Sequence, residues 1–436
     1  MSLLFAVALF VSALLLFWVQ PLVGKTVLPL LGGTPAVWNT CMLFFQAVLL
    51  AGYAYALALT RWLSARAQGL VHTGLLVVAA LALPPTLGAD ASGGVPEGGA
   101  PAWWLLKTLL LTVGPPFLVL SASAPLLQRW FSRTRDASAS DPYYLYAASN
   151  AGSLFALLGF PLLLEPSLTL GQQGRAWALG YGALAVLVAA CAFAALRTRA
   201  AAADVEGEAA GEAFDGGARD EDAPRVTWRR RLRWLLLSFA PSSLVLGVTT
   251  YVTTDLAAVP LLWVIPLALY LLSFVIVFAR GGVIKPGFAG RLVPGTAVLV
   301  ALVYLSGATE PVWFLIIFHL LFLFCAALVC HGQLADDRPA PARLAEFYLC
   351  LAAGGALGGL FNALVAPVAF DTLVEYPLVV VLATYLRPGF RRERGRLLGL
   401  RLGARRPASI SAAPDTFVAP DALDGDESVR DGRPGA

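Results

Sequence analysis

Charged side chains are scarce in this sequence of 436 residues. Asp, Glu, Lys and Arg together make up 13% of the chain, whereas hydrophobic residues make up 58%. A water-soluble chain of this length needs more polar surface to cover its cores, so the composition excludes an ordinary soluble protein. The small formal charge of +4 gives no indication of nucleic-acid binding, because basic loops beside an anionic leaflet explain it. We therefore expect an integral membrane protein whose first partner is the lipid bilayer.

Cysteine and histidine are also rare, with five and three residues respectively. All five cysteines fall in or at the ends of apolar runs, which favours small apolar fillers over disulfides. Cys325, Cys330 and His331 lack a fourth ligand and the usual spacing of a zinc site. The sequence thus predicts no metal site and no cofactor. The N-terminus also lacks the basic segment and cleavage site of a secretory signal, so we interpret it as the first membrane span.

Long apolar runs dominate what remains. A run of about 18 or more apolar residues is long enough to cross a bilayer as a helix. The expected spans are residues 2–24, 35–60, 69–87, 102–130, 142–163, 176–196, 232–254, 260–279, 292–305, 312–333, 344–368 and 373–386. The sequence therefore predicts an all-α polytopic membrane protein with about twelve transmembrane helices.

The hydrophilic breaks between these runs alternate in charge. Arginine collects after the second, fourth, sixth, eighth, tenth and last runs, whereas the other breaks carry mainly acidic residues such as Glu165, Glu310 and Glu375. Arg and Lys gather in short cytoplasmic loops. This pattern predicts a multi-pass protein of the cell membrane (plasma or inner) with both termini in the cytoplasm. We expect Glu165 and Glu375 to be solvated at outer helix ends.

Two landmarks recur in the same order along the chain. PAVW at 35–38 is matched by PLLW at 260–263, and YYL at 143–145 is matched by FYL at 347–349. Chance recurrence in apolar sequence is one explanation, but spacing, order and topology together favour two parallel six-helix repeats. Major facilitator proteins have this arrangement, with a solute site between the halves near the midplane.

These patterns divide the chain into four parts. Residues 1–200 form the first six-helix half and residues 229–388 form the second. Residues 201–228, acidic and rich in Ala and Gly, read as a disordered cytoplasmic linker. Residues 389–436 read as a disordered cytoplasmic tail whose basic start rests on the inner leaflet.

Several blocks resemble a known family, and together they cover nearly all of residues 2–388. They are QPLVGKTVLPLLGGTPAVWNTCMLFFQAVLLAGY (20–53), DPYYLYAASNAGSL (141–154), VTTYVTTDLAAVPLLWVIPLALYLLSF (248–274), LVCHGQLADDRPAPARLAEFYLCLAAGGALGGLFNALVAP (328–367) and VEYPL (374–378). The chain is similar to the membrane half of the fused membrane–spermidine synthase family. In that family a polytopic region precedes a soluble aminopropyltransferase-like domain, which binds decarboxylated S-adenosylmethionine and an amine acceptor.

The chain departs from this family in its hydrophilic stretches. The linker and the tail are each only a few dozen residues long and lack the alternating strands and helices of a doubly wound sheet. The Gly-rich run at 354–359 lies inside an expected span. We therefore expect no aminopropyltransferase activity from this chain, and hence no enzyme.

A few polar residues near the expected spans are candidates for binding a solute or ion, because charges at membrane depth are costly unless paired or hydrated. Lys25 is either a cation facing a cavity or a side chain that snorkels to the interface, and Gln20 and Asn39 are candidates to line the same region. Asp255 follows a polar helix end that includes Thr250 and Thr254. It is either a carboxylate for a cationic solute or a proton, or a solvated residue at a capped helix end.

Three further hypotheses concern charged partners. An ion pair between Lys25 and Asp255 would join the halves. His331, at the end of the tenth span, would relay protons near neutral pH or serve as a satisfied structural residue. Glu346 would cap its helix or pair locally with the neighbouring Arg343.

The function predicted from these features is transporter-like handling of a small cationic solute, such as a polyamine, by rocking of the halves. A second hypothesis is that the protein is a non-transporting membrane subunit that docks a separately made soluble aminopropyltransferase. A third is a sensing or lipid-facing scaffold whose chemistry the sequence does not reveal.

Overall fold

The computed structural model describes residues 1–31, 35–84, 101–206, 226–256, 262, 264–279 and 286–388. Within these residues every regular element is helical and no strand occurs. This agrees with the all-α prediction, and it follows from the medium, since each backbone N–H and C=O group in hydrocarbon must find a partner within its own helix.

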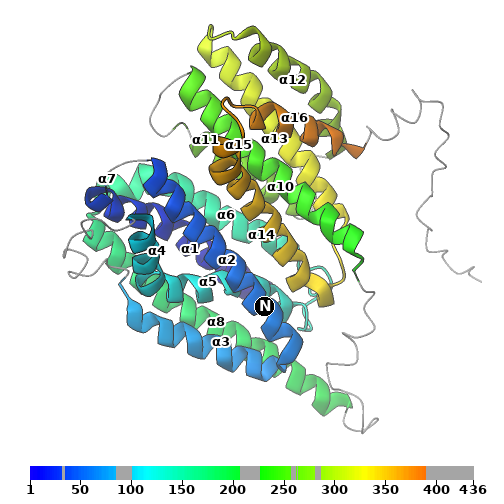
Figure 1. Ribbon diagram of the computed structural model, residues 1–436. Coiled ribbons are helices and arrows are strands. Elements are labelled where there is room, and N and C mark those ends of the chain that lie inside the picture. The colour runs from blue at the N-terminus through cyan, green and yellow to red at the C-terminus, as the bar shows by residue number, and fades with distance from the viewer. Residues whose placement is uncertain are drawn as a thin grey trace, which may run out of the picture. The chain divides into compact units, whose positions relative to one another are not determined.

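The helices fall into two consecutive groups (Figure 1). The first group is α1 (Ser2–Leu31), α2 (Pro35–Trp62), α3 (Ala65–Ala79), η1 (Ala80–Ala82), α4 (Pro101–Thr112), α5 (Gly114–Phe131), α6 (Tyr144–Gly159), η3 (Phe160–Leu164), α7 (Glu165–Ser167) and α8 (Leu170–Glu206). The second group is α10 (Trp228–Tyr251), η4 (Val252–Leu256), α11 (Val264–Phe278), α12 (Pro286–Ser306), α13 (Val312–Asp336), η5 (Pro341–Arg343), α14 (Leu344–Leu360), η6 (Phe361–Val365), α15 (Ala366–Ala369) and α16 (Glu375–Tyr385).

The described residues contain twelve apolar helical segments. Nine are long and apolar enough to cross a membrane, the bent pair α4 and α5 supplies a tenth, and the shorter apolar helices α11 and α16 supply two more. The predicted polytopic fold of about twelve helices is thus confirmed.

The expected span at 102–130 is broken into two helices, because the chain turns by 65° between α4 and α5. The break falls at Val113, just before Gly114, Pro115 and Pro116. Proline lacks a backbone N–H and is therefore favoured in the first turn of a helix, where Pro115 and Pro116 lie in α5. The sequence therefore contained the signal for two helices.

Two of the expected spans are also too short. Helix α1 continues past residue 24 to Leu31, and α8 runs from Leu170 to Glu206 instead of 176–196. A capping box begins α8, since the side chain of Gln172 accepts from the Thr169 backbone N–H at 2.9 Å and Thr169 Oγ1 accepts from the Gln172 N–H at 3.4 Å. The helix also extends into the segment predicted to be a linker.

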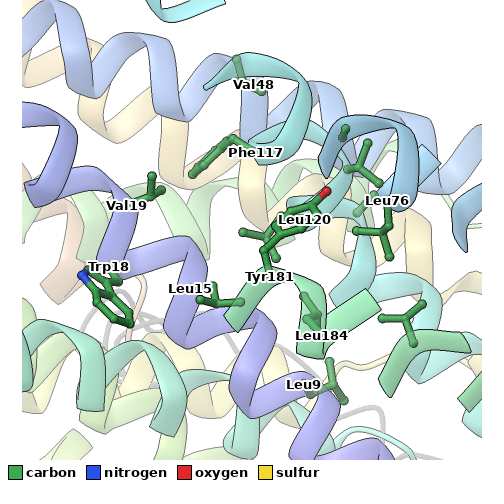
Figure 2. Close-up of a cluster of buried hydrophobic side chains, with 14 of the residues drawn as sticks. Leu9, Leu15, Trp18, Val19, Val48, Leu76, Phe117, Leu120, Tyr181 and Leu184 are labelled. Atoms are coloured by element: carbon green, nitrogen blue, oxygen red, sulfur yellow. The ribbon is translucent and has the colours of Figure 1, made fainter. Parts of the chain in front are cut away.

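The core of the first half surrounds α1 (Figure 2). Buried apolar side chains from α1, α2, α3, α5 and α8 pack together there, among them Leu9, Leu15, Val19, Val48, Leu76, Phe117, Leu120, Tyr181 and Leu184. The indole Nε1 of Trp177 donates to the carbonyl oxygen of Leu15 at 2.8 Å, which locks α8 against α1. Dispersion contacts and such hydrogen bonds stabilise helix packing where lipid competes for apolar surface.

The two halves repeat the same packing. Helix α1 packs on α5, α6 and α8, and α10 packs in the same way on α13, α14 and α16. The fifth segment of each half contains a five-residue π-helix, η3 in one and η6 in the other. The structure thus agrees with two parallel six-helix repeats. Between the halves, α6 packs on α11 and α2 packs on α14.

Two glycines make equivalent close contacts in the repeats. A Cβ atom at Gly152 would collide with the backbone carbonyl of Phe10, and a Cβ atom at Gly354 would collide with the carbonyl of Leu235. Glycine therefore lets α6 approach α1, and α14 approach α10, at backbone distance. By contrast, a Cβ atom at Gly159 or at Gly355 would meet nothing within 4 Å.

Replacing these glycines tests the packing. We expect Gly152→Ala and Gly354→Ala each to lower the free energy of unfolding by about 1–3 kcal/mol, because the helices must move apart. Gly159→Ala should leave stability unchanged or raise it slightly, because alanine favours helix. Thermal unfolding of the detergent-purified variants measures the difference, and equal melting temperatures for all three would contradict the packing argument.

Candidate functional site at the junction between the halves

Several loops of both halves meet at one end of the helix bundle, which we call the basic end. The Met1 amino group lies 3.7 Å from Asp136 Oδ2, and Arg338 Nη2 lies 2.8 Å from Asp141 Oδ2. Helices α1 and α6 begin at this end, and α5 and α13 end there. The loops therefore alternate between the two ends as predicted, while the cytoplasmic location of the basic end remains a prediction.

In each half, an acidic residue at the basic end links two helices, and the two acids occupy corresponding positions. Asp136, just after α5, accepts from the backbone N–H of Ser138 at 3.0 Å and of Ser2 at 3.1 Å. The Ser138 hydrogen bond is the main cause of the lowered pKa of Asp136, so the carboxylate stays ionised. Asp337, just after α13, accepts from the Trp234 indole at 3.1 Å. Each acid thus ties the end of a fourth segment to the start of the first.

The halves are joined at the surface of the basic end by polar contacts. Besides the Arg338–Asp141 ion pair, the Tyr143 hydroxyl donates to the carbonyl oxygen of Pro339 at 2.7 Å. The guanidinium of Arg338 also lies 5.4 Å from the centre of the Tyr143 ring. The ion pair is exposed, with 39% and 53% of the two side chains accessible, whereas Tyr143 is buried. Exposed ion pairs contribute only about 0–1 kcal/mol, so this contact is easily broken.

Aromatic side chains continue the junction inward. Tyr146 of α6 and Tyr348 of α14 lie with ring centres 4.9 Å apart, and Tyr146 meets Phe274 and Phe278 of α11 edge-on. The Tyr348 hydroxyl donates to Gln128 Oε1 at 2.6 Å, a buried hydrogen bond between the halves. Tyr146 precedes Gly152 by the same interval as Tyr348 precedes Gly354, so the stacked tyrosines occupy corresponding positions in the repeats. We call these four aromatic residues and Gln128 the aromatic seam.

A cavity of about 470 Å³ opens beside these contacts, with one wall from each half. Its polar lining includes Ser138, Ser140 and Asp141 from the first half, and Asp336 and Arg338 from the second. This volume is in the range that holds a small ligand. Hydroxyl and carboxylate oxygens supply acceptors on both walls, and the Arg338 guanidinium, which pairs with Asp141, supplies donors.

The first-half candidates lie away from this cavity. The Gln20 side chain is half-buried and its Nε2 donates to the Leu16 carbonyl at 3.2 Å. Lys25 lies within α1 and forms its ion pair with Glu165 of α7. The proposed partnership with Asp255 is therefore wrong, because a carboxylate of the same half already holds the lysine. Asn39 belongs to α2, but its side chain lies outside the described residues.

The second-half candidates lie on the last turns of the seventh segment. Thr250, Thr254 and Asp255 are all exposed, and the last two belong to the π-helix η4. The Thr254 hydroxyl donates to the Thr250 carbonyl at 2.7 Å, so it satisfies the backbone and does not face the carboxylate. Asp255 as a solute-binding carboxylate remains a prediction.

His331 is buried inside α13 and does not lie at its end. Its Nδ1 lies 2.7 Å from Ser273 Oγ, and its ring stacks on Phe274 with centres 3.5 Å apart. Because Phe274 also contacts Tyr146, the histidine forms a second layer behind the aromatic seam. This environment favours the structural interpretation of His331.

Two glutamates differ from expectation. Glu375 is buried, with only 8% exposed, because it lies in the first turn of α16 against the second-half core. Glu346 accepts from Arg231 Nε at 2.6 Å, so its partner is on α10, far away in the sequence. Partner choice across helices depends on their rotation, which local sequence does not specify.

Tyr143 and the residues of the aromatic seam are uncharged, so a criterion based on charge does not identify them. In the sequence, Tyr143 and Tyr348 stand out only as parts of the repeated YYL and FYL landmarks. The duplication itself is the sequence signal for these residues. Residues repeated on the fifth segment of each half are placed to meet at the axis between the halves. Gln128 carries no comparable signal.

No protein-family model matches the chain, and no curated protein matches it in sequence. Solved structures similar in fold include the major facilitator superfamily proton:xylose symporter XylE bound to 6-bromo-6-deoxy-D-glucose, at 11% identity and a TM-score of 0.56, covering 90% of this chain and 95% of that one. A bacterial homologue of the iron transporter ferroportin, in the outward-facing state with soaked iron, is 14% identical with a TM-score of 0.59, covering 88% and 96%.

An inward-open conformation of the xylose transporter XylE from E. coli is also similar, at 11% identity and a TM-score of 0.55, covering 90% of this chain and 96% of that one. At such identities the similarity shows the fold alone. The protein is a multi-pass membrane protein with a major facilitator-like fold, and the resemblance to spermidine synthase fusion proteins stays an expectation.

The seam hydrogen bond provides a test of the junction. Tyr348→Phe should lower the free energy of unfolding by about 1–3 kcal/mol, because it leaves the buried Gln128 oxygen unpaired. Tyr181→Phe is the matched control, since the buried Tyr181 hydroxyl has no hydrogen-bond partner in the described part of the chain. Melting temperatures in detergent measure both.

Adding Gln128→Leu to Tyr348→Phe should recover part of the loss, because neither polar group then remains unpaired. An unchanged melting temperature for Tyr348→Phe, or a double variant that loses the sum of both single effects, would contradict a coupled pair at this junction.

Proposed function

We propose that this protein carries a small solute across the cell membrane by rocking of its two halves, with the basic end facing the cytoplasm. The observation that carries this proposal is the nature of the junction at that end. The halves meet there through side chains, namely the Arg338–Asp141 pair, the Tyr143–Pro339 hydrogen bond and the aromatic seam. Such contacts can separate without disturbing the helices of either half.

The energies favour a reversible closure. An exposed ion pair contributes about 0–1 kcal/mol, a hydrogen bond about 0.5–1.5 kcal/mol, and an aromatic pair about 0.5–1.5 kcal/mol beyond its buried area. These polar and aromatic contacts contribute roughly a few kcal/mol to closure, in addition to the apolar packing of α6 on α11, and solute binding shifts two-state equilibria by energies of that size.

The solute we propose is a small organic cation, such as a polyamine. Its support is the resemblance to the membrane half of spermidine synthase fusion proteins, together with the acceptors that line the cavity. Asp336 lines the cavity together with the hydroxyl groups of Ser138 and Ser140, and Asp255 lies exposed in the π-helix η4. Protonated amines bind such oxygens through charge-assisted hydrogen bonds.

Flux into liposomes tests the proposal. Liposomes containing the purified protein should accumulate labelled putrescine or spermidine above empty liposomes, and labelled xylose provides a neutral comparison. Asp255→Asn should slow the uptake of the amines, because it removes a carboxylate at the solute's proposed path. Normal uptake in that variant would exclude Asp255 from the path. No uptake at all, with co-purification of a soluble aminopropyltransferase, would favour a docking subunit instead.

A charge exchange tests the role of the basic end. Arg338→Glu should reduce uptake, because two like charges then face each other and the end no longer closes. Arg338→Glu combined with Asp141→Arg should restore it, since the pair reforms with its charges exchanged. Transport that survives the single change, or that the double change does not restore, would contradict the proposed gate.

A further inference from the structure

The ammonium group of Lys25 contacts the same kinds of chemical group that would bind a free alkylammonium ion. The Lys25 ammonium of α1 donates to the carboxylate of Glu165 and lies 5.9 Å from the centre of the Phe160 ring. A carboxylate and an aromatic face are the two groups that best bind a primary ammonium, one by charge-assisted hydrogen bonding and the other through the ring quadrupole. The side chain therefore occupies a ready-made cation site.

The π-helix η3 creates this site. Its backbone bond runs from the Glu165 N–H to the Phe160 carbonyl, five residues back. A π-turn places residues five apart on the same face, whereas in an α-helix they would point about 140° apart. Pro161 lies within this turn, where its missing N–H removes one regular helix bond. Without the π-turn, the ring and the carboxylate would not face α1 together.

The site exists in one half only. The equivalent contacts of Gly152 with Phe10 and of Gly354 with Leu235 set the correspondence between the repeats. Lys25 follows Phe10 by the same number of residues as Thr250 follows Leu235, so Lys25 and Thr250 are corresponding positions. Counted from the two glycines, Glu165 corresponds to Pro367. A contact required by the fold would recur in both halves, so its presence in one half indicates a separate role.

The ion pair is accessible and weak. The Lys25 and Glu165 side chains are 36% and 40% exposed. They lie more than 20 residues along α1 and along the fifth segment from the basic end, which at about 1.5 Å per residue places them at the opposite end of the bundle. Exposed pairs of this kind change an equilibrium by at most about fivefold. An external amine can therefore compete with Lys25, whose ammonium remains hydrated when displaced.

We propose that Glu165 and Phe160 form a subsite for a primary alkylammonium group, which Lys25 occupies while no solute is bound. The inference rests on the proposed function, because it names the first contact of the cationic solute at the end opposite the basic end. Exchange of one ammonium for another leaves the charge on Glu165 balanced throughout.

Binding measurements test this subsite without requiring transport. The full chain in phosphatidylcholine nanodiscs is titrated calorimetrically with butylammonium. Lys25→Met should bind it about two- to fivefold more tightly than the unmodified protein, because the internal competitor is gone. Glu165→Gln should bind it at least tenfold more weakly. The matched controls Lys107→Met and Glu310→Gln change exposed residues elsewhere and should bind as the unmodified protein does.

Unchanged affinity in both Lys25→Met and Glu165→Gln overturns the subsite. If Lys25→Met is not monodisperse, Lys25→Arg replaces it; this variant keeps the ion pair, so tighter binding than in the unmodified protein would also overturn the proposal. Butylammonium binding that depends on Glu165, without polyamine flux, contradicts the proposed function alone. Flux and butylammonium binding that both persist in Glu165→Gln contradict the subsite alone.

Discussion

The need to satisfy every backbone polar group inside hydrocarbon shapes this protein more than any other constraint. It explains why the described residues form helices throughout, and why irregular backbone is confined to a few places. Two of those places are associated with proline. The α4–α5 break comes just before two consecutive prolines, and η3 contains Pro161. At η3, the turn that compensates for a missing N–H also brings together two side chains that an α-helix would separate.

Backbones approach each other closely within each half, whereas side chains join the halves at the basic end. Within a half, glycine allows backbone-to-backbone approach, as at Gly152 against Phe10, and a shift there would break many dispersion contacts at once. At the basic end the halves are linked mainly by polar tips and stacked rings, such as Tyr146 on Tyr348. Rigid bodies joined by exchangeable side-chain contacts move as units, so the packing itself determines where movement is possible.

Much of the fold could be predicted from the sequence because its signals are local. The length of an apolar run determines a span, and arginine in a short loop indicates its side. The α4–α5 break and the capping box at Thr169 also have local sequence signals, namely the two consecutive prolines and the Thr-x-x-Gln spacing. Partnerships across the bundle were not predictable. Lys25 and Glu165 are separated by 140 residues and Gln128 and Tyr348 by 220, and only the rotation of packed helices brings them together.

The ion pair of Lys25 with Glu165 cannot itself move the halves, because both residues belong to the first half. A ligand shifts a conformational equilibrium only by the difference between its affinities for the two states. A solute ammonium held by Glu165 and Phe160 alone would bind both states equally and shift nothing. On the proposed mechanism, the contact that differs must come from the second half. Thr250 occupies there the position that corresponds to Lys25, and Asp255 lies exposed just beyond it. A diamine with one ammonium group on Glu165 would therefore bring the halves together at this end only when its other ammonium group reaches the polar turn of the second half.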